Sequence, residues 1–450
     1  MNPNIFREYD IRGRVPEDLN KDTVYELGRA MGAYFVKNGI KRISLGRDCR
    51  LSSSEIRDIL ADALTRSGVD IIDIGLVPTP VLYFSLFNLE VQGGVQITAS
   101  HNPPEYNGFK VCVGKTTIYG EEIQKIRKIG EEGSFVEGQG SYETEDIVST
   151  YISYVVENMR LGKNRVKVVV DGGNGVGGQV AIEIYSRMGI EVVDLFCNPD
   201  GRFPNHHPDP TVVENLKYLI SKVKELNADL GIGFDGDADR IGVIDSSGEI
   251  IWGDQLMIIF SRDLLEERPQ SKIIAEVKCS QVLFDDIKRH NGIPIMWKVG
   301  HSLIKSKMKE EGALLAGEMS GHMFFNDRYY GYDDAIYAGA RLLEILTRKE
   351  KDIREHLKDV PKMVNTPEIR IDCPDEIKFN LVKELAEEFK KDYEVIDIDG
   401  ARVLFRDGWG LVRASNTQPV LVLRFEAESE DALERIKRLF MDKIERRLSK

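Results

Sequence analysis

Three aspartates alternate with small residues in the segment GIGFDGDADR, positions 231–240. Asp235, Asp237 and Asp239 follow directly after an apolar run, so they belong to a loop at the end of a predicted strand. Carboxylates at this spacing can surround one hard cation, and Mg²⁺ prefers oxygen ligands while it leaves room for a phosphate oxygen. Carboxylates so close together repel one another unless a cation compensates their charge. We therefore favour a metal site over a solvated acidic turn.

An EF-hand calcium loop is the main alternative for this aspartate pattern. That loop needs a glycine at its sixth position and a glutamate at its twelfth. Arg240 and Ser246 occupy those positions here, which argues against an EF-hand. Arg240 can instead contact a phosphate or neutralise part of the carboxylate charge.

A serine follows another apolar strand in the segment ITASHNPPEYNGFKV, positions 97–111. Ser100 precedes an Asn-Pro turn, so we expect its hydroxyl at an exposed strand end. No Gly-x-Ser-x-Gly motif surrounds it, which argues against the nucleophile of a hydrolase triad. His101 taken alone is typical of a structural histidine. The segment by itself does not distinguish a turn serine from a nucleophile.

Alternating polar residues occupy the segment GEMSGHMFF, positions 317–325. Alternate residues of an extended loop point the same way, so Glu318, Ser320 and His322 can face one ligand. Glutamate and serine suit the hydroxyls of a sugar, and a histidine can transfer a proton. A polar hairpin turn is the alternative interpretation.

A run of hydrogen-bond donors lies in the segment VRASNTQPVLVL, positions 412–423. A guanidinium, two hydroxyls, an amide and backbone N–H groups at such spacing resemble a phosphate cradle. These side chains belong to Arg413, Ser415, Asn416 and Thr417. An ordinary polar turn would leave so many donors unused.

The glycines of DGGNGVGG, positions 171–178, suggest a different class of enzyme. Gly173, Gly175 and Gly178 match the G-x-G-x-x-G fingerprint after a strand, and Asp194 stands where a ribose-binding acid is expected. An NAD-dependent oxidoreductase is therefore an alternative. Tight strand-to-helix turns produce the same glycines for structural reasons.

A second possible metal site is the segment with His206, His207 and Asp209. Neighbouring histidines point apart in an extended chain. Thr211 and Glu214 have the spacing of a capping box, so we interpret this segment as a loop that leads into a helix.

The elements that must position these loops alternate between β-branched runs and amphipathic helical stretches, which indicates α/β architecture. Residues 41–64, 166–189 and 271–292 each read as strand, polar loop and helix, and each precedes one of the special loops. We predict three similar α/β domains with mixed sheets between helices, plus a smaller C-terminal α+β domain. The predicted domains are 1–145, 146–250, 251–361 and 362–450.

Composition narrows the classes of partner. The 450 residues carry a formal net charge of −13, which argues against nucleic acid or an anionic membrane as the main partner. The N-terminus lacks an apolar signal core, and no apolar run could span a bilayer. The five cysteines form no Cys-x-x-Cys pair and are typical of thiols in a reducing cytoplasm, where we expect the protein. The sequence makes no prediction of the oligomeric state.

Six motifs together resemble the α-D-phosphohexomutase family, and they occur in the order that the family has. They are FREYDIRG, TASHNP, DGGNG, DGDADR, GEMSGH and RASNT. The resemblance covers essentially the whole chain and implies four domains around a central cleft. Within the family, FREYDIRG and GEMSGHMFF look most like the phosphomannomutase/phosphoglucomutase branch. The phosphoglucosamine mutase branch usually has glutamine where Met319 stands.

The resemblance also implies roles for individual residues. The phosphoserine falls on Ser100, and one of its phosphate oxygens would join Asp235, Asp237 and Asp239 around one Mg²⁺. Glu318 and Ser320 would bind the sugar. The expected catalytic set is Ser100, His101, Arg12, Lys110, Arg240 and His322. The expected substrate-binding set is Tyr9, Lys278, His301, Glu318, Ser320, His322, Arg413, Ser415, Asn416 and Thr417.

The expected reaction moves a phosphate between the 1- and 6-hydroxyls of mannose or glucose through a hexose 1,6-bisphosphate. Phosphoglucosamine mutase is the alternative nearest to it. A sugar-phosphate sensor without catalysis is the non-enzymatic alternative, but an intact Ser100 with three aspartates argues against it. Which of Arg12, Lys110 and His322 moves the proton stays open.

Overall fold

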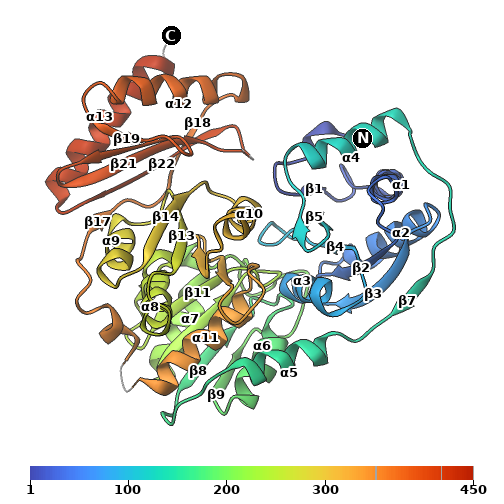
Figure 1. Ribbon diagram of the computed structural model, residues 1–450, viewed down its shortest axis with the longest axis horizontal. Helices are drawn as coiled ribbons and strands as arrows, with labels where there is room; N and C mark the ends of the chain where they lie inside the picture. Colours follow the sequence, from blue (N-terminus) through green and yellow to red (C-terminus); the bar gives the residue numbers. More distant parts are fainter. Residues whose placement is uncertain (350–351, 417, 449–450) are drawn as a thin grey trace.

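The computed structural model describes residues 1–349, 352–416 and 418–448. It contains four sheets with helices packed on them (Figure 1), which confirms the predicted α/β fold class. The exact domain boundaries drawn from the sequence stay a prediction. None of the helices in the described part of the chain is long and apolar enough to cross a bilayer.

The first sheet has seven strands and belongs to the N-terminal part of the chain. Its order is β1-β5-β4-β2-β3-β7, and β6 pairs with β5. The strands are β1 (Ile11–Arg14), β2 (Arg42–Arg47), β3 (Asp70–Leu76), β4 (Gly93–Ile97), β5 (Tyr106–Val113), β6 (Thr116–Thr117) and β7 (Tyr142–Thr144). The helices are α1 (Lys21–Lys37), α2 (Ser53–Thr65), α3 (Thr79–Asn88) and α4 (Glu121–Glu132).

The second sheet has the order β12-β11-β10-β8-β9, and the third has the order β14-β13-β15-β16. The second comprises β8 (Lys167–Asp171), β9 (Glu191–Leu195), β10 (Leu230–Phe234), β11 (Ile241–Asp245) and β12 (Ile250–Ile251), with α5 (Val148–Asn158), α6 (Gly178–Arg187) and α7 (Lys217–Leu226). The third comprises β13 (Lys272–Glu276), β14 (Ile293–Trp297), β15 (Leu315–Gly317) and β16 (Met323–Phe325), with α8 (Gly253–Glu267), α9 (Gln281–Arg289), α10 (His301–Glu311) and α11 (Ala335–Arg348).

The fourth sheet is antiparallel throughout and has the order β17-β22-β21-β20-β19, with β18 beside β22. This arrangement is the α+β unit expected at the C-terminus. It comprises β17 (Val364–Asn365), β18 (Ile369–Asp372), β19 (Glu394–Ile396), β20 (Ala401–Phe405), β21 (Gly408–Ala414) and β22 (Val420–Ala427), with α12 (Asp375–Phe389) and α13 (Glu430–Leu448).

The first three sheets repeat one plan. In the orders β3-β2-β4-β5, β9-β8-β10-β11 and β14-β13-β15-β16, three parallel strands are followed by one antiparallel strand. The expected similarity of the first three domains is thereby confirmed. The turn between the last two strands carries a special loop each time: Ser100 after β4, the aspartates after β10 and Glu318 after β15. The fourth loop likewise joins two antiparallel neighbours, β21 and β22.

Local sequence explains where several elements begin and end. The side chain of Asn20 accepts from the N–H of Thr23 at the start of α1, and Asp334 accepts from the N–H of Tyr337 at the start of α11. Helix α4 ends at Gly133, whose φ of 62° is the left-handed conformation that glycine adopts without strain.

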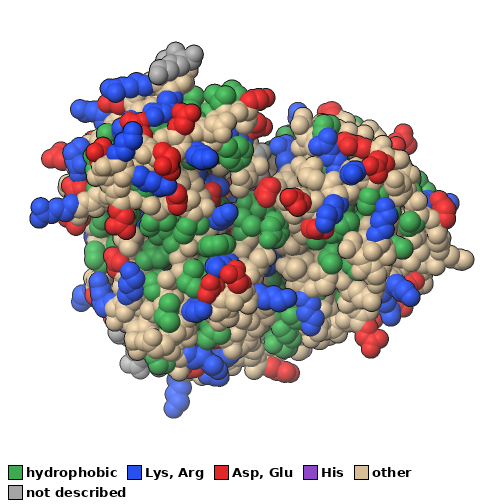
Figure 2. All heavy atoms as spheres, turned by 45° about the horizontal axis from the view of Figure 1, so that its top comes forward, with side chains coloured by type: hydrophobic (Ala, Val, Ile, Leu, Met, Phe, Trp, Pro, Cys, Tyr) green, Lys and Arg blue, Asp and Glu red, His purple; other side chains and the backbone are tan. Residues whose placement is uncertain are grey.

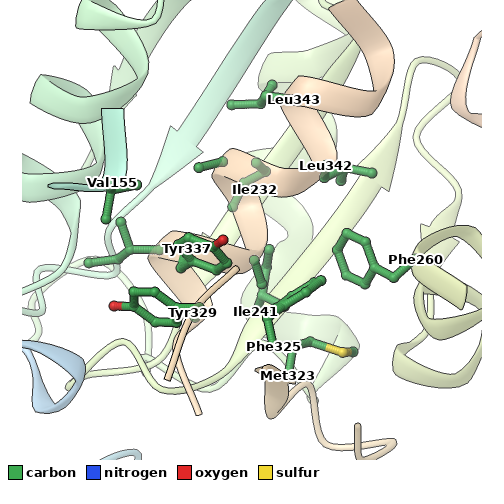
Figure 3. Close-up of a cluster of buried hydrophobic side chains, with 14 of the residues drawn as sticks. Val155, Ile232, Ile241, Phe260, Met323, Phe325, Tyr329, Tyr337, Leu342 and Leu343 are labelled. Atoms are coloured by element: carbon green, nitrogen blue, oxygen red, sulfur yellow. The ribbon is translucent and has the colours of Figure 1, made fainter. Parts of the chain in front are cut away.

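The largest core runs through the first three sheets, whereas the fourth has a core of its own. In Figure 3, Tyr337, Leu342 and Leu343 of α11 belong to one buried cluster with Ile232 and Ile241 of the second sheet and with Phe260 and Phe325 of the third. Helix α11 therefore ties the second sheet to the third. A small cluster of Val277, Trp409 and Leu411 joins the C-terminal unit to the third sheet.

The surface is hollowed between the lobe of the fourth sheet and the lobe of the first (Figure 2). Positive and negative side chains are interspersed on the face in view instead of forming one block of a single sign. The loop after β4 belongs to the lobe of the first sheet, and the loop between β21 and β22 belongs to the lobe of the fourth.

Candidate active site

Ser100 lies directly after β4 in a turn that is closed by its own side-chain contacts. Its φ of 49° is uncommon for a residue other than glycine. Its N–H donates to Oγ1 of Thr98 over 2.9 Å. Only 3% of Ser100 is exposed, so the expectation of an exposed hydroxyl was wrong. The loop after β10 contacts the serine and covers it.

A fully buried arginine holds the Ser100 loop in shape. Arg50 donates to four backbone carbonyls of this loop and pairs with Asp48 over 3.1 Å. The carbonyls belong to Ser100 at 2.8 Å, Asn102 at 2.6 Å, Pro103 at 2.6 Å and Tyr106 at 3.0 Å. Satisfying these carbonyls fixes a turn that would otherwise be strained.

The three aspartates converge as the sequence suggested. Each is at most 1% exposed, and one oxygen of each lies within 4.8 Å of the others. Oδ1 of Asp237 and Oδ1 of Asp239 are buried and accept no hydrogen bond from any described residue. Buried carboxylate oxygens without a partner are costly, and this donor set fits a hard divalent cation such as Mg²⁺.

Lys110 of β5 neutralises part of this charge. Its Nζ lies 2.7 Å from Oδ2 of Asp237 and also contacts Asp239. Although burial opposes ionisation, Lys110 and hydrogen bonds hold the pKa of Asp237 below its usual value. Burial and the other two aspartates raise the pKa of Asp235. Lys110 is shared between Asp237 and Asp239, so this lysine alone does not balance their charge.

The serine and the aspartates meet at one point. The hydroxyl of Ser100 donates to Oδ2 of Asp235 over 2.7 Å, and Nδ1 of His101 lies 3.0 Å from the same hydroxyl. Burial, together with Arg240 and Arg12, lowers the pKa of His101 well below its ordinary value. His101 is therefore a neutral partner of the serine.

The next contact joins the aspartate loop to the loop after β15. Nε of Arg240 donates to Nε2 of His322 over 3.1 Å. The imidazole of His322 stacks on that of His301, with ring centres 5.4 Å apart and planes inclined by 13°. These contacts bring Arg240, His301 and His322 together. All three are among the site residues that the family resemblance implies.

Glu318 and Tyr9 both contact the turn at residues 299–300, and Tyr9 also contacts the fourth unit. Oε1 of Glu318 accepts from the N–H of Gly300 over 2.7 Å. The hydroxyl of Tyr9 donates to the carbonyl of Val299 over 2.9 Å and accepts from the amide of Asn416 over 3.1 Å. Residues from the first, third and fourth sheets therefore meet around Tyr9.

The phosphate-cradle candidates lie on the fourth unit. Nε of Arg413 donates to Oδ2 of Asp399 over 3.1 Å, and the N–H of Val299 donates to the same oxygen over 3.0 Å. Ser415 accepts from the N–H of Gln418 over 3.2 Å. Thr417, the remaining candidate, lies outside the described residues.

The Lys278 loop is held from the fourth unit by two buried arginines. Arg402 donates to the carbonyls of Val277 at 2.6 Å and Cys279 at 2.7 Å, and Arg424 donates to that of Lys278 at 2.6 Å. Nζ of Lys278 itself lies 3.3 Å from Glu368. Side chains of the fourth unit therefore hold the backbone around Lys278 in place.

The surroundings of Arg12 and Ser320 do not indicate a particular ligand. Arg12 pairs with Asp10 over 2.5 Å and also contacts the side-chain oxygen of Asn102, which places it at the Ser100 loop. Ser320 is half-buried next to Glu318 in its loop.

Comparisons with known proteins identify the family. Models of the phosphoglucomutase/phosphomannomutase family match as α/β/α domains I, II and III at residues 3–137, 149–248 and 252–364, and as the C-terminal domain at 368–443. This chain belongs to the phosphoglucomutase/phosphomannomutase family. The four matches lie in the order expected from the motifs.

Two curated relatives and one solved structure of the family cover nearly the whole chain. The phosphomannomutase/phosphoglucomutase of Pseudomonas aeruginosa is 47% identical over 442 residues, 98% of this chain and 95% of that protein. The phosphoglucomutase of Neisseria gonorrhoeae is 48% identical over 98% of this chain and 97% of its own length. A family protein of Burkholderia thailandensis has a solved structure with TM-score 0.93 at 44% identity, which covers 98% of this chain and 97% of that one.

The glycine segment serves packing in this family member. A Cβ on Gly175 would lie 2.6 Å from the carbonyl oxygen of Gly236 in the aspartate loop, and one on Gly178 would lie 2.7 Å from Cβ of Cys197. These glycines let the backbones approach one another, and the oxidoreductase alternative loses its main support.

The histidine segment is also structural. Nε2 of His206 lies 3.0 Å from a carboxylate oxygen of Asp171, and Thr211 donates to Asp209 over 2.6 Å. The expected capping box of Thr211 does not form, because the short helix that follows (Val213–Leu216) has Val212 at its N-cap. The interpretation of this segment as a loop that leads into a helix was correct.

Four buried residues that sequence reasoning did not select complete the site. Each acts on a partner from a distant part of the sequence, so no local spacing announces it. Thr79 donates to Asp237 over 2.5 Å, Arg50 holds the Ser100 loop, and Lys305 donates to Asp333 over 2.8 Å. A charged or hydroxyl side chain in an otherwise apolar element is the only signal that these positions carry.

Proposed function

We propose that this protein interconverts hexose 1-phosphate and hexose 6-phosphate, with mannose or glucose as the sugar. The contact of the Ser100 hydroxyl with Asp235, inside a cluster of carboxylates suited to a cation, carries the proposal. Relatives that are 47% and 48% identical bear the names phosphomannomutase/phosphoglucomutase and phosphoglucomutase, which supports the substrate class.

Ser100 carries the phosphoryl group between the two hydroxyls. The Oγ–P bond of phospho-Ser100 breaks as a sugar oxygen bonds to phosphorus; the sugar hydroxyl gives up its proton, and the released Oγ takes up a proton to become the serine hydroxyl. The resulting hexose 1,6-bisphosphate turns round and returns its other phosphate to Ser100. A covalent intermediate divides one difficult transfer into two direct ones.

Contacts at the site favour His322 as the group that takes the proton. Lys110 is held by Asp237 and Asp239, and Arg12 pairs with Asp10, so both are charged donors. Nε2 of His322 carries no proton where it accepts a hydrogen bond from Nε of Arg240, and its lone pair is engaged as long as that bond is made. His322 can therefore take the sugar proton in a complex in which the substrate draws Arg240 away from Nε2.

Asp235, Asp237 and Asp239 would hold Mg²⁺ together with an oxygen of phospho-Ser100. When bound, the ion would neutralise charge on the group in transfer. Lys110 and Arg240 contribute fixed positive charge around the same group.

The fourth unit would hold the phosphate that does not react. Asn416 contacts Tyr9, and Asp399 joins Arg413 to the turn at Val299. Since this unit has its own core, it can open for the turn of the bisphosphate and close for each transfer.

Replacement of the serine tests the proposal. Ser100→Ala should abolish conversion of glucose 1-phosphate and mannose 1-phosphate, whereas Ser186→Ala, on the exposed side of α6, should leave it unchanged. Intact-protein mass spectrometry should find phosphate on the wild-type chain and none on Ser100→Ala. Normal turnover by Ser100→Ala would contradict the proposal. Assays with glucosamine 1-phosphate in parallel compare the alternative substrate.

A further inference from the structure

Two consecutive buried aspartates precede α11 and contact different surroundings. Asp333 is fully buried and Asp334 is 1% exposed. Asp334 accepts from the hydroxyls of Tyr151 and Tyr329 over 3.0 and 2.7 Å, and from the N–H of Tyr337 over 2.8 Å. Asp334 therefore caps the helix and anchors it in the core.

Asp333 contacts the candidate active site instead. Its Oδ1 accepts from Nζ of Lys305 over 2.8 Å. Its Oδ2 lies 3.1 Å from Nδ1 of His301 and 3.4 Å from Nδ1 of His322; the contact with His322 is electrostatic, since neither Oδ2 nor that nitrogen makes a hydrogen bond with a described residue. One carboxylate oxygen thus faces the same nitrogen of both stacked imidazoles.

The other ring nitrogen of His322 defines its tautomer. Nε2 accepts from Nε of Arg240 over 3.1 Å, and an arginine keeps its proton, so Nε2 has none. In the neutral ring the proton is on Nδ1, which faces Oδ2 of Asp333 and lies 3.6 Å from Oδ1 of Asp239. A carboxylate opposite Nδ1 is a common means of setting the tautomer and orientation of an imidazole whose Nε2 binds another group.

The backbone of Asp333 is held rigidly. It leads directly into α11, which is buried along nearly all its length between the second and third sheets (Figure 3). An orienting group is effective only when its own support does not move. Lys305, which is 7% exposed and lies 4.2 Å over the ring of Tyr83, balances the carboxylate charge.

We propose that Asp333 is a positioning residue for the transfer reaction. It holds His322 with Nδ1 towards α11 and Nε2 towards Arg240, and it holds His301 parallel to that ring. The inference rests on the proposed function, since the reaction that benefits is the mutase reaction. Asp333 touches no reacting atom and acts through the two imidazoles.

Matched asparagine substitutions at the two aspartates test this role. Asp333→Asn keeps the size of the side chain and removes its charge, and kcat for glucose 1-phosphate should fall about 10- to 100-fold while KM changes less than about threefold. Asp334→Asn keeps a good N-cap residue and should change kcat less than about twofold. A kcat within twofold of wild type in Asp333→Asn, or a loss expressed only in KM, would overturn the proposal.

A double variant separates positioning from folding. Asp333→Asn leaves Lys305 buried without its carboxylate, so Asp333→Asn/Lys305→Met removes both charges. The double variant should melt near the wild-type temperature and still show the low kcat. Recovery of kcat would mean that Asp333 matters only for balancing Lys305, and the proposal would be wrong.

A measurement of the ring itself does not depend on turnover. With ¹⁵N-labelled histidine, the Nδ1–H signal of His322 should be present in wild type, shift or vanish in Asp333→Asn and persist in Asp334→Asn. An unchanged signal in Asp333→Asn would overturn the positioning role. Absence of hexose phosphate conversion by the wild-type enzyme, with the ring signal behaving as stated, would instead count against the proposed function alone.

Discussion

The hydroxyl of Ser100 donates a 2.7 Å hydrogen bond to Oδ2 of Asp235, across 135 positions of sequence. The serine belongs to the loop after β4 and the aspartate to the loop after β10, so two repeats of one fold supply the two halves of this contact. A phosphate on the serine would place oxygens where the hydroxyl now meets the carboxylate.

Gly236 sets how closely the two loops approach. A Cβ at this position would lie 2.5 Å from the carbonyl oxygen of Ser100, a separation that backbone atoms do not tolerate. Gly236→Ala should therefore displace one loop and lower kcat/KM at least about 100-fold, as small misplacements at a reacting centre do. Gly233→Ala is the control, because its Cβ would come no closer than 3.4 Å to Leu219. Equal activities of the two variants in a steady-state assay would refute this account.

Lys110 and a bound cation should substitute for each other in stabilising the aspartates. Lys110→Met leaves Asp237 and Asp239 buried without their partner, which should cost about 3–5 kcal/mol of unfolding free energy in metal-free protein. Mg²⁺ should then raise the melting temperature of Lys110→Met more than that of wild type. Lys128→Met, at a side chain that is 74% exposed, should behave like wild type. A smaller Mg²⁺-dependent shift in Lys110→Met than in wild type would contradict the cation site.

Asp334 should make stability depend on pH in one direction. Burial raises its pKa to about 6, against the hydrogen bonds that it accepts. Between the ordinary carboxyl pKa and about 6, the folded state binds more protons than the unfolded state, so stability falls as pH rises. The loss is about 1.4 kcal/mol per pH unit within that window. Below it the contribution is fully present.

Comparison with Asp334→Asn isolates this group from all other titrations. The difference in melting temperature between wild type and Asp334→Asn should change between pH 4 and pH 6 in favour of the variant, and then level off above about pH 6. Parallel curves for the two proteins would show that Asp334 does not titrate in this range.

Arg402 should control how well the substrate is held. Its guanidinium stacks 3.8 Å above the ring of Trp409 and binds the carbonyls on either side of Lys278. Lysine lacks the planar fork that makes these contacts. Arg402→Lys should release the Lys278 loop and lower kcat/KM about tenfold, mainly through a higher KM. Arg435→Lys, an exposed pair with Asp407, is the control. An unchanged KM in Arg402→Lys would show that the contacts of Arg402 do not position Lys278.

The aspartate cluster could be predicted because its members are neighbours in sequence. Asp235, Asp237 and Asp239 share one loop, and their mutual repulsion is a local property. The burial of Ser100 could not be predicted, because a different loop covers it. Arg50 and Asp333 were missed for the same reason: the groups that they orient lie elsewhere in the chain.

By itself the sequence determined the alternation of strands and helices, the repeat of one α/β plan, and the six motifs with their order, since these depend on residue types at short spacing. Only the tertiary structure decided that the first three loops meet, that Ser100 is buried against Asp235, and that Asp333 faces both imidazoles while Asp334 caps α11. The physical reason is range: propensity and periodicity act over a few residues, whereas burial and long-range hydrogen bonds exist only after distant segments have packed.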